Sequence, residues 1–194
     1  MENNMPDLNE FMQALGDQAL RKQRVICISE PIDSRVAKRV VGQLLTMESD
    51  APGETITIYQ NSPGGEVNSG FAIFDMIRFI SSEVKVVNCG LCASIATVIN
   101  VAAKKENRFG TPNSKFLIHQ PLIAGTIRGQ ASDIEITAND IIKTREKINR
   151  LLAEECGQNL EKVERDTLRD YWMNAQEAVE YGLVCKIIES NKDL

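Results

Sequence analysis

Apolar residues recur along the chain with two spacings, one typical of strands and one typical of helices. Near the start, Leu8, Phe11, Met12 and Leu15 stand at i, i+3, i+4 and i+7 and predict a short amphipathic helix. Strands are predicted at residues 25–29, 55–59, 84–88, 115–120 and 184–189. Helices are predicted at about 33–47, 68–80, 92–103 and 132–155, the last ended by Gly157, with two shorter helical patterns in the tail.

The order of these elements predicts the fold class. Strands separated by helices form βαβ units, so we expect an α/β domain with a largely parallel sheet. Residues 61–67, NSPGGEV, form a turn between a strand and a helix, and residues 123–130, IAGTIRGQ, form an extended or looped insertion. No internal repeat, low-complexity tract or linker divides the 194 residues, so we expect one domain over 1–194.

Composition narrows the class of protein. With 43% hydrophobic and 25% charged residues the chain resembles ordinary soluble globular proteins. A net charge of −5 and a pI of about 5.1 offer no basic stripe for nucleic acid. No segment approaches the ~18 apolar residues of a membrane span, and the N-terminus lacks the pattern of a signal peptide. We therefore expect a cytoplasmic protein without nucleic-acid or membrane partners.

Five cysteines include the motif Cys89-Gly90-Leu91-Cys92. A C-x-x-C pair suits a redox centre or half of a zinc site, but zinc usually takes four ligands and no second pair follows. Reduced thiols that pack in the interior are the favoured interpretation. We expect neither a metal nor a cofactor.

The stretch GLCASIATVIN places Ser94 just after a predicted strand, at the start of an apolar helix. At such a place free N–H groups and the helix dipole favour developing negative charge, which suits a nucleophile. A serine at a helix start is more often a cap, so this position alone does not decide between the two roles.

A serine nucleophile needs a base, and His119 is the only histidine in the chain. It stands at the end of the predicted strand KFLIH. A carboxylate would orient its imidazole ring, and spacing leaves both Asp166 and Asp170 in ERDTLRD as candidates.

The turn NSPGG could supply an oxyanion hole, because Gly64 and Gly65 let backbone N–H groups approach a ligand. A plain turn and a phosphate cradle are the alternatives. The turn lacks the lysine of G-x-x-x-x-G-K-[ST] and the spacing of G-x-G-x-x-G, which disfavours nucleotide binding.

From residue 25 to 189 the chain resembles the ClpP family of self-compartmentalised serine peptidases, through NSPGG, GLCASI, PNSKFLIHQP, GQASDIEI, ERDTLRD and NAQEAVEYGLV. The resemblance implies a ClpP/crotonase-like fold with repeated β-β-α units, a head and a protruding handle at about 120–156. It assigns the nucleophile to Ser94, the general base to His119 and the orienting acid to Asp170. Its oxyanion donors fall on the N–H groups of Gly65 and Ile95. The substrate-binding residues it implies are Gly64, Glu66, Val67 and Leu122, and the inter-ring residues are Gln130, Asp133 and Arg169.

The family further implies an assembly: two stacked heptameric rings around a chamber, fed with unfolded proteins by an ATP-driven AAA+ unfoldase. Residues 1–24 would form the axial segment. Three features differ from the family pattern: Ile95 replaces a usual methionine, Leu168 a usual acidic residue, and His119 to Gln130 is two residues longer than usual. Leu168 and the N-terminal helix leave one alternative to an active serine endopeptidase, a weakly active or inactive ring subunit that partners a second ClpP-type isoform. A second alternative is a crotonase-type acyl-CoA enzyme, a class that resembles ClpP in fold and also holds an oxyanion with backbone N–H groups.

Overall fold

A seven-stranded sheet organises the computed structural model, which describes residues 16, 18–122 and 128–194. The strands are β1 (Val25–Ile28), β2 (Ile56–Ser62), β3 (Val84–Ala93), β4 (Arg108–Gly110), β5 (Lys115–Ile118), β6 (Tyr171–Asn174) and β7 (Lys186–Ile187). Their order is β1-β2-β3-β4-β7, and β5 pairs with both β3 and β6. All pairs are parallel except the antiparallel pair of β5 and β6. The predicted α/β fold with a largely parallel sheet is confirmed.

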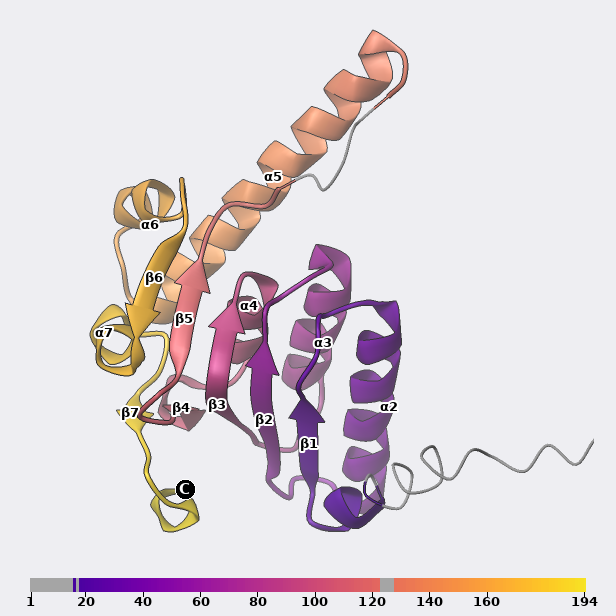
Figure 1. Cartoon of the computed structure of the whole chain (residues 1–194). Helices are drawn as coiled ribbons and strands as arrows, with labels where there is room; N and C mark the ends of the chain where they lie inside the picture. Colours follow the sequence, from indigo (N-terminus) through magenta and orange to yellow (C-terminus); the bar gives the residue numbers. More distant parts are fainter. Residues whose placement is uncertain (1–15, 17, 123–127) are drawn as a thin grey trace, which may run out of the picture.

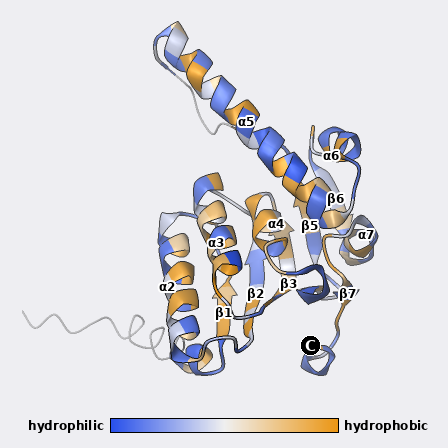
Figure 2. Cartoon of the chain, turned by 180° about the vertical axis from the view of Figure 1, so that it is seen from behind, coloured by the Kyte–Doolittle hydropathy of each residue, from blue (hydrophilic) through white to orange (hydrophobic). Residues whose placement is uncertain are grey.

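Helices cover one face of this sheet. They are α2 (Ser34–Asp50), α3 (Val67–Phe79), α4 (Ile95–Asn100), α5 (Ala131–Cys156), α6 (Leu160–Asp166) and α7 (Ala175–Tyr181), with short 3-10 turns η1 (Lys105–Asn107) and η2 (Asn191–Asp193). Figure 1 shows α2 and α3 side by side along the sheet, whereas α5 projects far beyond it. Figure 2 gives the same arrangement from behind, with apolar residues scattered along the projecting part of α5.

The main core lies between the sheet and α2, α3 and α4. Alternate residues of the strands face it, for example Ile26 on β1, Ile58 on β2 and Val86 on β3, all essentially without solvent exposure. On α2, Val40 and Leu44 pack against them one turn apart. Asp33 caps this helix by accepting hydrogen bonds from the first-turn N–H groups, which satisfies donors that the helix leaves free.

The strand β3 is longer than predicted and changes partner along its length. Its first half pairs with β4 and its second half, Leu91 to Ala93, pairs with β5. Between the two halves the register against β2 shifts, so that Gln60 opposes Asn88 and Ser62 opposes Cys92. The prediction of a helix from residue 92 is therefore wrong: Cys92 lies in the strand and α4 contains only six residues.

Other differences concern short elements. The three-residue β4 and the antiparallel β6 were not predicted, whereas α2, α3 and α5 lie within a few residues of their predicted positions. The predicted helix around Leu8 to Leu15 and most of the insertion 123–130 lie outside the described residues. None of the helices that the structure describes is both long and apolar enough to cross a membrane.

Candidate active site

Ser94 lies in a strained turn between β3 and α4. Its backbone has φ +56° and ψ −128°, a combination that residues other than glycine rarely adopt. Its N–H donates to the carbonyl of Leu117 on β5 at 2.9 Å, which holds the turn against the neighbouring strand. The side chain makes no capping hydrogen bond to α4, so the interpretation of Ser94 as a cap does not hold.

The Ser94 hydroxyl instead contacts His119. The distance from Ser94 Oγ to His119 Nε2 is 2.8 Å, and His119 Nδ1 lies 3.1 Å from Asp170 Oδ1. A carboxylate accepts hydrogen bonds, so an Nδ1–H of the imidazole donates to Asp170 and Nε2 is left to accept the serine proton. The three side chains thus form a continuous chain of donors and acceptors.

The sheet places these residues together. His119 directly follows β5 and Asp170 directly precedes β6, and the antiparallel register pairs Ile118 with Tyr171. The predicted base and the predicted acid therefore stand opposite each other at the same edge. Ser94 follows β3, whose Ala93 pairs with Leu117, so the predicted nucleophile lies at that edge as well.

The structure distinguishes between the two candidate acids. Asp166 Oδ2 accepts hydrogen bonds from Lys162 Nζ at 2.9 Å and from the Tyr181 hydroxyl at 3.2 Å. Burial, together with the Asp166 charge, raises the pKa of Tyr181 above its usual range and keeps that phenol protonated. Asp166 therefore belongs to a separate cluster, and only Asp170 reaches His119.

Gln120 contributes to this arrangement and was not singled out from the sequence. Its N–H donates to the carbonyl of Thr167 at 2.7 Å, and its Nε2 donates to the carbonyl of Leu168 at 2.9 Å. The residue after the base thus binds the segment that carries Asp170. Only its position next to His119 could have indicated this role.

The glycine turn lies directly against Ser94. A Cβ on Gly64 would come within 2.7 Å of Ser94 Cβ, and one on Gly65 within 2.1 Å of the Ile32 carbonyl oxygen. Both glycines have positive φ, and hydrogen bonds from Ile32 to Gly64 and from Glu66 to Ile32, each 2.8 Å, fix the turn. Within the described part of the chain, no acceptor binds the N–H of Gly65 or of Ile95. These two groups can therefore receive an oxyanion.

Of the predicted substrate-binding residues, Val67 shares a pocket with Ser94 and His119. Val67 lines a small apolar pocket of about 20 Å³ together with Ser94, His119, Ile95, Thr97, Val98, Ile118, Pro121, Ile148 and Leu152. Leu122 is 69% exposed and Glu66 accepts a hydrogen bond from Ser69 Oγ at 2.8 Å. The pocket beside Ser94 and His119 is thus more apolar than charged.

The cysteine motif is separate from this site. Cys92 is buried, and burial raises the pKa of its thiol well above the usual range, as it does less strongly for Cys89. Neither thiol is bridged, and no group of residues in the described ranges could hold a metal ion. Cys92 packs in the main core, whereas the half-buried Cys89 donates from Sγ to the Gln60 carbonyl at 3.7 Å.

The predicted inter-ring residues Gln130, Asp133 and Arg169 are all exposed. Gln130 precedes the first residue of α5, and Asp133 lies in its first turn. In the described part of the chain Arg169 has no ion-pair partner, so its guanidinium is available to another chain.

Comparison with known proteins gives consistent matches over nearly the whole chain. The family model described as Clp protease matches residues 12–191. The ATP-dependent Clp protease proteolytic subunit 2 of Treponema denticola is 50% identical over 181 residues, which cover 93% of this chain and 89% of the relative. The proteolytic subunit 3 of Rhizobium etli is 48% identical over 175 residues, or 90% and 89% of the two chains. A solved structure of a ClpP1 mutant from Listeria monocytogenes is 46% identical with a TM-score of 0.83, covering 90% of this chain and 96% of that one.

Proposed function

The chain belongs to the Clp protease family of serine peptidases, as a proteolytic subunit, and on that premise we propose that Ser94, His119 and Asp170 are its catalytic triad. The observation that carries the proposal is the continuous hydrogen-bonded chain from Ser94 Oγ through the imidazole to Asp170. A structural serine would not need a strained backbone and an uncapped hydroxyl directed at the only histidine.

The geometry supports peptide-bond hydrolysis by acyl transfer. His119 Nε2 removes the proton as Ser94 Oγ attacks the scissile carbonyl, and Asp170 stabilises the imidazolium that forms. The N–H groups of Gly65 and Ile95 receive the oxyanion of the tetrahedral intermediate. His119 then donates its proton to the leaving amine, and water repeats the sequence to release the acyl group.

Substrate would lie extended between two segments. Gly64, Glu66 and Val67 follow β2, and Leu122 follows His119, so a peptide placed between them runs past Ser94. Binding through backbone hydrogen bonds is nearly independent of sequence, which suits an enzyme that digests many unfolded proteins.

Kinetics of triad variants test this assignment. Ser94→Ala and His119→Ala should each abolish peptide cleavage with no further loss in the double variant, because both disable one step. Asp170→Asn should lower turnover by about 10⁴-fold, because the imidazole would take the wrong tautomer. Asp166→Asn is the matched control and should retain turnover. Additive losses, or a serine-directed phosphonate that fails to label Ser94, would contradict the triad and favour a crotonase-type acyl-CoA enzyme.

A subunit of an ATP-dependent protease acts in an oligomer with an ATPase partner, and we propose two stacked heptameric rings in the cytoplasm with an AAA+ unfoldase. The projecting α5 exposes Ile134, Ile136 and Ile142, apolar side chains that contact between the handles of facing rings would cover. Residues 120–156 would form this handle and 1–24 the axial segment. The intact triad favours an active ring subunit, either alone or beside a second ClpP-type isoform.

A further inference from the structure

Three amide side chains lie in the core where β2, β3 and the helix that follows Ser94 meet. Gln60 on β2, Asn88 on β3 and Asn100 at the end of α4 are each 0% exposed. On β2 the core-facing positions before Gln60 are Ile56 and Ile58, so the amide interrupts an apolar row. Buried amides are unfavourable unless they are hydrogen-bonded, and this cluster therefore needs an explanation.

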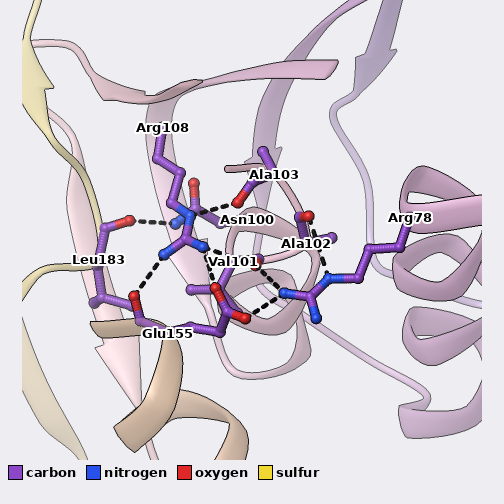
Figure 3. A network of polar contacts seen from close by, with 8 residues as sticks. All are labelled: Arg78, Asn100, Val101, Ala102, Ala103, Arg108, Glu155 and Leu183. Atoms are coloured by element: carbon purple, nitrogen blue, oxygen red, sulfur yellow. Dashed lines mark hydrogen bonds and ion pairs between the residues drawn. The ribbon is translucent and has the colours of Figure 1, made fainter. Parts of the chain in front are cut away.

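The three amides form one connected network. Gln60 Nε2 donates to Asn88 Oδ1 and to the Ala96 carbonyl, each at 3.0 Å, and lies 3.2 Å from Cys92 Sγ. Asn88 Nδ2 donates to Asn100 Oδ1 at 2.8 Å and to the Phe109 carbonyl at 3.0 Å. Asn100 Nδ2 in turn donates to the carbonyl of Leu183 at 2.7 Å, a contact that Figure 3 shows.

The partners fix the orientation of each amide. Reversing Gln60 would direct its oxygen at two other oxygens, those of Asn88 and Ala96, so the amide nitrogen must face them. The Gln60 Oε1 atom is then buried without a hydrogen-bond partner among the described residues. A residue selected only for stability would not leave such an atom, since an apolar side chain of the same size would fill the space.

The network binds α4 at both of its ends. Gln60 contacts the carbonyl of Ala96 in the first turn, one residue after Ile95, and Asn100 is the last residue of the helix. A helix of six residues has little stability of its own, so its position is set by the groups that bind it. The N-terminal contact is the one closest to the N–H that faces the oxyanion.

We propose that Gln60 is a positioning residue for acyl transfer: it holds the first turn of α4 so that the Ile95 N–H points at the developing oxyanion. This inference rests on the proposed function. Asn88 and Asn100 orient Gln60 and hold the far end of the helix. On this proposal, the cost of leaving Gln60 Oε1 unpaired is offset because the amide nitrogen of the same side chain positions the first turn of α4.

The test is Gln60→Met, which keeps the side-chain length and removes both donors. Its matched control is Ile58→Met, two residues earlier on the same strand and equally buried. For a short fluorogenic peptide we expect kcat to fall about 10- to 100-fold in Gln60→Met, since a small misplacement of a reacting group has effects of this size. KM should stay unchanged, and the control should keep full kcat.

A peptide aldehyde distinguishes positioning from a loss of stability. It forms a hemiacetal that uses the oxyanion site, so its Ki should rise by the same factor as kcat/KM falls. The midpoint of thermal unfolding should stay within a few degrees of wild type. The variant Gln60→Met/Asn88→Leu/Asn100→Leu replaces the whole network with apolar side chains, and should fold while kcat stays low.

Each outcome has one meaning. Full kcat in Gln60→Met or in the triple variant, a Ki for the aldehyde that does not change, or a loss of activity matched by Ile58→Met would overturn the role of Gln60. Phosphonate labelling of wild-type Ser94 is measured in parallel. If wild type is not labelled, the proposed function fails; if it is labelled and Gln60→Met keeps its kcat, only the positioning role fails.

Discussion

Gly70 on α3 offers a direct way to displace the Ile95 side chain beside the proposed oxyanion site. A Cβ at this position would lie 2.1 Å from Ile95 Cγ1, 3.1 Å from Cδ1 and 3.3 Å from Cβ. Real Cβ atoms do not approach other carbons this closely, so Gly70→Ala forces Ile95 to move. Because Ile95 is buried, its side chain cannot turn into solvent and part of the displacement must reach its backbone.

Helix propensity and core overpacking have opposite effects on the free energy of unfolding of Gly70→Ala. Alanine is favoured over glycine inside a helix by about 1 kcal/mol, whereas overpacking a core costs about 1–3 kcal/mol. The net effect of Gly70→Ala is therefore a loss of about 0–2 kcal/mol in the free energy of unfolding, and a fall of up to about 8 °C in Tm for a chain of this length. The expected loss of kcat is larger, about tenfold or more, because the Ile95 N–H shifts relative to the oxyanion.

The assay is peptide turnover and thermal unfolding for Gly70→Ala, Ile95→Ala and the double variant. Removing Cγ1 and Cδ1 frees the space that the new methyl needs, so the double variant should be more active and more stable than the two single effects predict. Gly42→Ala on α2 is the control, since nothing lies within 4 Å of its new Cβ, and it should be stabilising. Full turnover in Gly70→Ala, or strictly additive effects in the cycle, would refute the reasoning.

Three further predictions follow from contacts away from the triad. Glu155→Gln should lower the free energy of unfolding in urea by about 3 kcal/mol, because Arg108, 1% exposed, loses its carboxylate and keeps only carbonyl partners; a loss below about 1 kcal/mol contradicts this. Hydrogen bonds from the hydroxyls and N–H groups of residues 81–82 lower the pKa of Glu48 from 4.5 to about 2. The ionised side chain therefore contributes its full stabilisation of the folded state above pH 4.5, and this contribution is lost as the pH falls toward 2. In urea, the free energy of unfolding of Glu48→Gln should therefore differ from that of wild type by a constant amount above pH 5, and the two values should converge below pH 4.5. A difference that does not depend on pH contradicts this. Arg169→Ala and Asp133→Ala should each split a double ring in analytical ultracentrifugation, whereas intact double rings would remove these residues from the ring contact.

The two arginines that pair with Glu155 bind carbonyl groups just after the C-terminal end of α4, the helix that follows Ser94. Figure 3 shows the carboxylate of Glu155 between the guanidinium groups of Arg78 and Arg108. Arg108 also donates to the carbonyls of Val101 and Ala103, just after α4, so two cations lie where the helix dipole is negative. Arg78→Met is the matched control, with a smaller effect, because Arg78 is 41% exposed and its pair with Glu155 is screened by solvent.

The periodicity of apolar residues was sufficient to predict the long elements. Helices α2, α3 and α5 each carry a regular apolar stripe, and capping residues such as Asp33 and Gly157 mark where two of them begin or end. The boundary between β3 and α4 could not be predicted in the same way, because residues 89–99 are small or apolar throughout and fit either period. Pairing with Phe116 on β5 and with Ser62 on β2 decides that Cys92 is in a strand.

The spacing of apolar residues also did not predict which polar residues are buried. Gln60 fell between the predicted strand 55–59 and the predicted turn 61–67, and Asn88 was the last residue of a predicted strand. Amides usually lie at the surface, so neither residue was expected in the core. In the sequence they are 28 positions apart, and nothing local indicates that they oppose each other on neighbouring strands. A polar residue at a core-facing position of a strand is a signal that could have found Gln60, once β2 is extended to Ser62.

The same limitation explains why local spacing could not choose the acid. In a purely parallel sheet, reacting groups collect after the carboxyl ends of strands, and a residue that precedes a strand lies at the opposite edge. Asp170 precedes β6 and still meets His119, because β6 runs antiparallel to β5. Had β6 been parallel, Asp170 would lie at the far edge of the sheet. The one antiparallel pair among the described strands therefore brings Asp170 to His119 in the proposed triad. The four residues of β6, Tyr171–Asn174, are too short a segment for periodicity to detect.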